Sequence, residues 1–177
     1  MEQENQIRNL IEKIEKFKTS DKIDLSSKED LAIAVMNLIS LEEHFFFTYN
    51  KTGKDSYLQL LNEIRQMRKK YLAEIVKNPE GEIWCISKHL LASAMRFMEV
   101  GTKFLNEGKQ KEAKDLFEKA NSLWNIFWGL NLNLLDIKDV AKESGDKQEI
   151  VLEKGKKASV FDALNNVVKK ILDCCRE

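Results

Sequence analysis

Apolar residues recur at helical spacing along most of the chain. Ile7, Leu10, Ile11, Ile14 and Phe17 stand three or four residues apart, which predicts an amphipathic helix over residues 4–18. Similar stripes predict further helices that include residues 31–49, 60–76, 83–105, 113–130 and 160–172. Because the strong patterns follow a helical period and not a period of two, the predicted fold class is all-α.

Short polar segments predict where these helices begin and end. Ser26 or Ser27 is expected to cap the second helix, and Gly53 suits a left-handed position at its end. Pro79 fits the first turn of the fourth helix, and "NEGKQ" predicts a glycine-centred turn after it. The segment 136–158 is less regular, although "QEIVLEKGKKAS" contains a short β-like run.

The connections between the central helices are short. Connections of about two to eight residues favour antiparallel neighbours. We therefore expect an up-down antiparallel bundle of about five to six helices, with the terminal helices packed on it. The length of 177 residues fits a single domain over 1–177.

The charge balance gives no general attraction for nucleic acid. Lys and Arg number 29, Asp and Glu also number 29, and the formal net charge is zero. A nucleic-acid-associated accessory protein is an alternative that would depend on the local basic stretch "RQMRKKY", which contains Arg65, Arg68, Lys69 and Lys70.

The cysteines and the N-terminus predict a cytoplasmic protein that does not bind a membrane. Cys85, Cys174 and Cys175 form no disulfide framework or Cys-x-x-Cys motif. The first residues lack the apolar core of a signal peptide, and no apolar run approaches the roughly 20 residues that span a bilayer.

One helical hairpin resembles a tetratricopeptide repeat over residues 94–125. Counted from Gly101, the small and aromatic residues Phe104, Ala113, Phe117 and Ala120 fall at the offsets of that repeat, whereas Asn125 replaces its customary proline. No second unit lies about 34 residues away, so the resemblance implies an isolated hairpin and not a stacked array.

Cys85 and His89 are the pair most similar to metal ligands. They stand four residues apart, on one helix face, which is compatible with zinc. Adding His44 and Glu43 from another helix is unfavourable, because in an up-down bundle the two histidines would differ by about 10 Å in height. We therefore predict no metal, no cofactor and no catalytic residue.

The polar residues predict a weaker kind of site. Glu42 or Glu43 with His44 and Arg96 or Glu99 should form a hydrogen-bonded cluster, while Cys85 and His89 should face the basic helix between residues 68 and 74. An alternative function is thus a small ligand-binding or enzymatic bundle with a polar site around Cys85 and His89. The candidate binding residues are Glu43, His44, Arg68, Trp84, Cys85, His89, Arg96 and Glu99.

Aromatic residues exceed what one apolar stripe needs. Consecutive residues step about 100° around a helix, so Phe46 and Phe47 cannot both face the same core as Phe45. Phe46, Phe47, Trp124 and Trp128 are therefore candidates for an interface. The function predicted is a protein-protein interaction or scaffold module, with a protein partner or a second copy in a homodimer.

Overall fold

Helices dominate the computed structural model, which describes residues 25–77, 81–136, 150–152 and 156–158 together with residues 9, 12, 13, 164, 165 and 168. Strands β1 (Ile150–Leu152) and β2 (Lys156–Ala158) form an antiparallel ribbon where the sequence shows its β-like run. The all-α fold class is thus confirmed apart from this ribbon. The helices of the described part are α2 (Ser26–Thr52), α3 (Ser56–Ile75), α4 (Glu82–Asn106) and α5 (Gln110–Asn131).

The helix boundaries agree with the sequence except at the starts of α2 and α4. α4 begins at Glu82, three residues after Pro79, with Gly81 at its N-cap, so Pro79 is not in its first turn as predicted. In α2, Ser26 is already helical, Leu25 occupies the N-cap position, and no side chain caps the helix. Leu25 is 2% exposed, so its burial in the core fixes this end in place of a serine hydroxyl. At the other end Gly53 has a φ of 65°, as predicted, and its N–H donates to the carbonyl oxygen of Tyr49 at 2.7 Å.

Two of the predicted helices lie mostly outside the described residues. Within the segment 4–18, only Asn9, Glu12 and Lys13 are described, and all three are helical and exposed, as expected of its polar face. Leu164 and Val168 are helical and buried within the C-terminal segment. Pro79 also lies outside the described residues.

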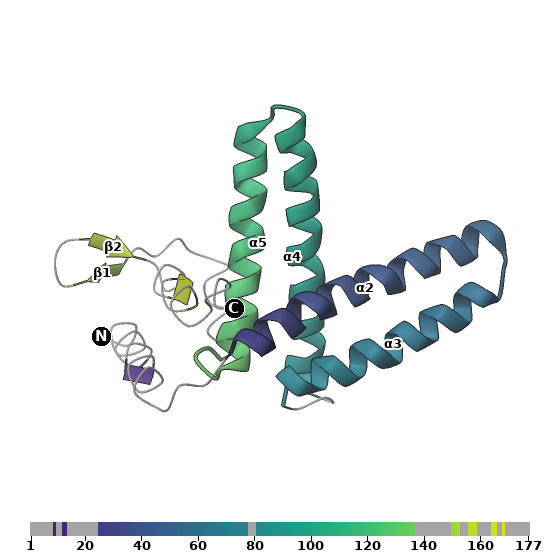
Figure 1. The fold of residues 1–177 in the computed structure, drawn as a ribbon. Helices are drawn as coiled ribbons and strands as arrows, with labels where there is room; N and C mark the ends of the chain where they lie inside the picture. The colour runs from purple at the N-terminus through teal and green to yellow at the C-terminus, as the bar shows by residue number, and fades with distance from the viewer. Residues whose placement is uncertain are drawn as a thin grey trace.

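The four helices form two antiparallel hairpins that cross. Figure 1 shows α2 and α3 as one pair and α4 and α5 as the other, with α2 crossing α4 and the two pairs pointing in different directions. The up-down bundle is not confirmed, because the α2/α3 hairpin does not run alongside α4 and α5. Its outer half, near Gly53, extends away from the other hairpin.

The hydrophobic core lies where the hairpins meet. It joins the first half of α2, the end of α3, the first half of α4 and the last turns of α5. The largest side chains that it buries, at 0–1% exposure, are Leu72, Leu91, Phe127, Trp128 and Leu164. Burial is therefore concentrated at this junction, and the outer halves of both hairpins contain few of the buried apolar residues.

The repeat-like hairpin packs closely at Gly101. Gly101 is buried, and a Cβ at this position would lie 2.7 Å from Cε1 of Phe117 on α5. Ala113 on the same helix is fully buried. Asn125, which replaces the proline of the repeat, is 2% exposed and donates to Oδ1 of Asn165 at 3.2 Å. This side chain therefore connects α5 to the C-terminal segment.

Candidate functional site

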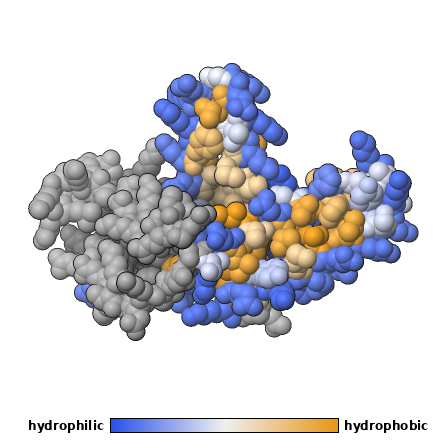
Figure 2. Space-filling view, viewed as in Figure 1, coloured by the Kyte–Doolittle hydropathy of each residue, from blue (hydrophilic) through white to orange (hydrophobic). Residues whose placement is uncertain are grey.

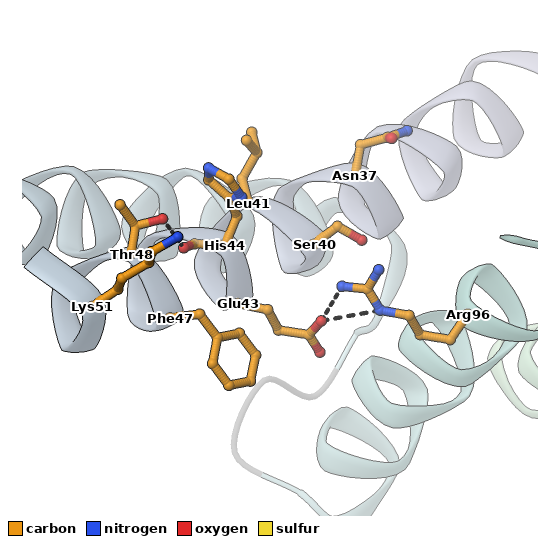
Figure 3. Close-up of a pocket in the computed structure, with 9 residues that line it drawn as sticks. All are labelled: Asn37, Ser40, Leu41, Glu43, His44, Phe47, Thr48, Lys51 and Arg96. Atoms are coloured by element: carbon orange, nitrogen blue, oxygen red, sulfur yellow. Dashed lines mark hydrogen bonds and ion pairs between the residues drawn. The ribbon is translucent and has the colours of Figure 1, made fainter. Parts of the chain in front are cut away.

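A surface hollow of about 730 Å³ lies beside α2 near its crossing with α4. Figure 3 shows that all but one of the drawn side chains come from α2, with Arg96 reaching across from α4. Leu41 and Phe47 are the apolar residues of its lining, and the others are polar or charged. Its lining residues are Asn37, Ser40, Leu41, Glu43, His44, Phe47, Thr48, Lys51 and Arg96.

Arg96 links two carboxylates at one edge of this hollow. It donates to Glu43 through both Nε, at 3.1 Å, and Nη2, and to Glu99 through Nη1 at 2.6 Å. Hydrogen bonds to Glu43 and then to Glu99 raise the pKa of the Arg96 guanidinium above its usual value. The predicted contact of Glu43, Arg96 and Glu99 is thus present, and it tethers α2 to α4.

His44 lies at a different part of the hollow. Figure 3 shows Glu43 and Phe47 on the side of α2 toward Arg96, whereas His44 and Leu41 project elsewhere. The His44 ring is exposed and contacts Phe45 edge to face, with centroids 5.9 Å apart. The acidic and basic groups of the predicted cluster therefore meet without the imidazole.

Glu42 and Arg68 form an ion pair inside the α2/α3 hairpin. Nε of Arg68 is 2.7 Å from Oε1 of Glu42, Nη2 is 3.1 Å from Oε2, and the side chains are 5% and 15% exposed. This corrects the prediction that Arg68 lies near Cys85 and His89. It also removes Arg68 from the basic stretch proposed to bind nucleic acid, because its guanidinium faces a carboxylate and not solvent.

Cys85 and His89 do not enter an enclosed site. Both are exposed on α4, while Trp84 is half-buried and packs against the core. The height argument for separating His44 from His89 assumed parallel helices, and α2 instead crosses α4. Among the described residues no group of three or more His, Cys, Asp or Glu side chains could hold a metal ion.

The four aromatic interface candidates divide into two pairs. Phe46 and Phe47 are 51% and 67% exposed and contact each other edge to face. Trp128 is 1% exposed and Trp124 is half-buried. The Trp124 ring stacks on Phe127, and the Trp128 ring lies edge to face with both of them. Trp128 is therefore not available to a partner in this fold, because it completes the core.

A second apolar surface covers one side of the α2/α3 hairpin. Glu42 and Arg68 meet across the two helices, so Leu41 and Met67, one position earlier on each, turn about 100° away from that contact. Antiparallel helices turn in opposite senses when seen from one end, so both residues reach the same side. Leu60, seven residues before Met67, joins them. These side chains are 39%, 45% and 40% exposed.

This side of the hairpin faces away from α4. Glu43, one position after Glu42, turns to the opposite side and contacts Arg96 of α4. Figure 2 shows an apolar area extending over both helices of the hairpin. We call this surface the open face; besides its exposed members Leu41, Leu60 and Met67, it includes the half-buried residues Leu38, Phe45, Ile64 and Tyr71.

The composition of α2 is unusual for a helix of which so little is buried. The stretch Ser27–Thr52 is long and apolar enough to cross a membrane by length and composition alone, and only 22% of its apolar part is buried. The sequence reading that no such segment exists is therefore not upheld. The charged residues Glu42 and Glu43 interrupt the stretch, and each contacts an arginine of another helix.

Comparisons with known proteins assign no relatives. No protein-family model matches the chain, and neither the curated proteins nor the solved structures that were compared include a match.

Proposed function

We propose that this protein is a helical protein-protein interaction module that presents the outer half of its α2/α3 hairpin to another protein chain. The observation that carries the proposal is the exposure of large apolar side chains there. Phe47 is 67% exposed, Phe46 is 51% exposed, and Leu41, Leu60 and Met67 of the open face are each about two-fifths exposed. Phe47 lies on the side of α2 toward Arg96, whereas Leu41, Leu60 and Met67 lie on the open face, so apolar side chains are exposed on both sides of this half of the hairpin. Exposed apolar patches are typical of interaction sites.

The burial energies support this assignment. Fully burying a Phe, Leu or Met side chain stabilises a structure by about 1.5–3 kcal/mol, and Phe46 and Phe47 leave more than half of that unused. Aromatic residues and methionine are also enriched in protein interfaces. The neighbouring Glu43, Arg96 and Glu99 supply charged groups at the rim, where a partner's polar residues can select orientation.

The proposed module contains five to six helices in all. The four described helices would be completed by a helix within residues 4–18 and another within 159–172. Leu164 and Val168, which are 0% and 3% exposed and belong to the core, support docking of the second of these. In this arrangement the terminal helices stabilise the junction of the hairpins, and the outer half of α2/α3 is left for binding.

Affinity capture from an extract of the source cells tests the proposal. The bait is compared with a Phe46→Ser/Phe47→Ser variant and with Leu105→Ser, a control at a 49% exposed leucine on α4. We expect proteins that bind the parent to be several-fold depleted on the double variant and retained on the control. Equal capture by the parent and the double variant, or none above background, would contradict the assignment.

A further inference from the structure

We infer that the open face of the α2/α3 hairpin binds the same face of a second copy of this chain, with a two-fold axis passing close to Met67. This inference rests on the proposed function and names the partner and the surface. The two hairpins then form an antiparallel four-helix arrangement in which α3 packs on α3 of the other copy and α2 packs on α2. Such an interface is formed by the same surface of both copies, and its two-fold symmetry limits the assembly to a dimer.

The size of the open face fits a reversible dimer. α3 has 20 residues, which at 1.5 Å per residue gives a length of about 30 Å, and two adjacent helices are about 20 Å wide. Each copy would therefore bury about 600 Å², or about 1,200 Å² in total. That is the lower limit of specific, stable interfaces. We accordingly expect an association that depends on protein concentration.

The uncharged side chains of the open face can pack against the same side chains of a second copy. The stripe on α2 (Leu38, Leu41, Phe45) and that on α3 (Leu60, Ile64, Met67, Tyr71) contain no charged side chain, so nothing ionic is desolvated at the centre. Aliphatic and sulfur-containing groups from one copy would fill the spaces between those of the other.

Charges at the edge of the face are self-complementary. Glu63 and Lys70 are exposed and stand seven residues apart, two helical turns, along the outer edge of α3. The midpoint between them falls at Gln66 and Met67. A two-fold axis at that level places Glu63 of each copy opposite Lys70 of the other, so that two ion pairs form. The same register brings Met67 of both copies together at the centre.

Sedimentation velocity on the full chain over a wide concentration range tests the inference. Parent protein should show a monomer-dimer equilibrium. Met67→Ser should weaken the dimer by about tenfold to one-hundredfold, because the apolar contact is lost twice. Met98→Ser is the matched control, since Met98 on α4 is 44% exposed against 45% for Met67. Circular dichroism confirms that each variant retains its helices.

Charge exchange tests the register. Glu63→Lys and Lys70→Glu should each weaken the dimer by about fivefold or more, and the double variant Glu63→Lys/Lys70→Glu should restore it. A strict monomer, or a dimer that Met67→Ser and the single charge variants leave unchanged, would overturn the inference. So would a monomer that binds phosphatidylcholine/phosphatidylglycerol vesicles through Met67, because the face would then contact lipid. The capture experiment with the Phe46→Ser/Phe47→Ser variant is a separate measurement. Its result decides the proposed function whatever the sedimentation experiments show.

Discussion

Replacing Arg68 by methionine isolates the contribution of the ion pair between α2 and α3. Methionine retains much of the apolar stem of arginine, so the change removes mainly the charge and the two hydrogen bonds to Glu42, of 2.7 and 3.1 Å. Glu42 is 15% exposed, and its carboxylate would be left between two helices with little water to replace the guanidinium. The variant therefore tests whether this pair is desolvated.

The expected loss follows from that burial. Removing one partner of a buried ion pair destabilises a protein by about 3–5 kcal/mol, because the other charge is left uncompensated. Partial access of water to Glu42 puts the expected cost of Arg68→Met at the lower end, about 3 kcal/mol. Changing both residues, as Glu42→Leu/Arg68→Met, removes both charges, and the free energy of unfolding should return to within about 1 kcal/mol of the parent.

Urea unfolding followed by circular dichroism measures these differences. The parent, the Glu42→Leu and Arg68→Met single variants and the double variant complete a thermodynamic cycle whose coupling energy belongs to the pair. Arg65→Met, at an exposed position on the same helix, is the control and should change stability by less than about 0.5 kcal/mol. If Arg68→Met proves no more destabilising than Arg65→Met, the pair does not act as a buried one and the reasoning is refuted.

Three other predictions concern close packing and exposure. Gly101→Leu should destabilise the protein by about 1–3 kcal/mol in urea melts, because even the Cβ of the new side chain would lie 2.7 Å from the Phe117 ring. Gly101→Ala should stay within about 1 kcal/mol of the parent, because the half-buried ring can shift to accept one methyl group. Gly129→Ala should cost about 1–3 kcal/mol by calorimetry, since its Cβ would meet Leu135 Cδ1 at 2.7 Å in the core; an unchanged melting temperature would disprove this contact. Phe47→Ser should alter thermal stability by less than about 0.5 kcal/mol, and a larger loss would show that the ring supports the monomer.

The helices could be predicted because the information that specifies them is local. Apolar residues at steps of three and four define each stripe, and Gly53 supplies the left-handed residue that ends α2. The exception at Ser26 has a tertiary cause. Leu25 is buried in the core and occupies the N-cap position, so Ser26 is already the first helical residue and cannot cap the helix. A cap that depends on a distant contact is not visible in a local pattern.

The candidate site could be predicted only in part, because its contacts depend on how the hairpins cross. Glu43, Arg96 and Glu99 were expected to meet, and they do so because α2 passes α4 at this level. The partner of Arg68 was missed. A signal for it was present: Arg68 stands four residues after Ile64 and four before Leu72, within the apolar stripe of α3. A cation at such a position requires a carboxylate from the neighbouring helix, and Glu42 provides it.

The apolar stripe of α3 shows why the open face could not be recognised before the fold. Its C-terminal part is buried, with Leu72 at 0% and Ile75 at 4% exposure, whereas Leu60 and Met67 are 40% and 45% exposed. In sequence the two parts look alike, since a helix face that packs on its own chain and one that packs on another molecule need the same residues. The two parts differ because the helices of this hairpin are longer than the core that covers them. α2 has 27 residues and extends about 40 Å, but the core covers only its first half. The half of α2 beyond the core therefore exposes apolar side chains. These can be identified as a binding face only after the structure shows where the core ends.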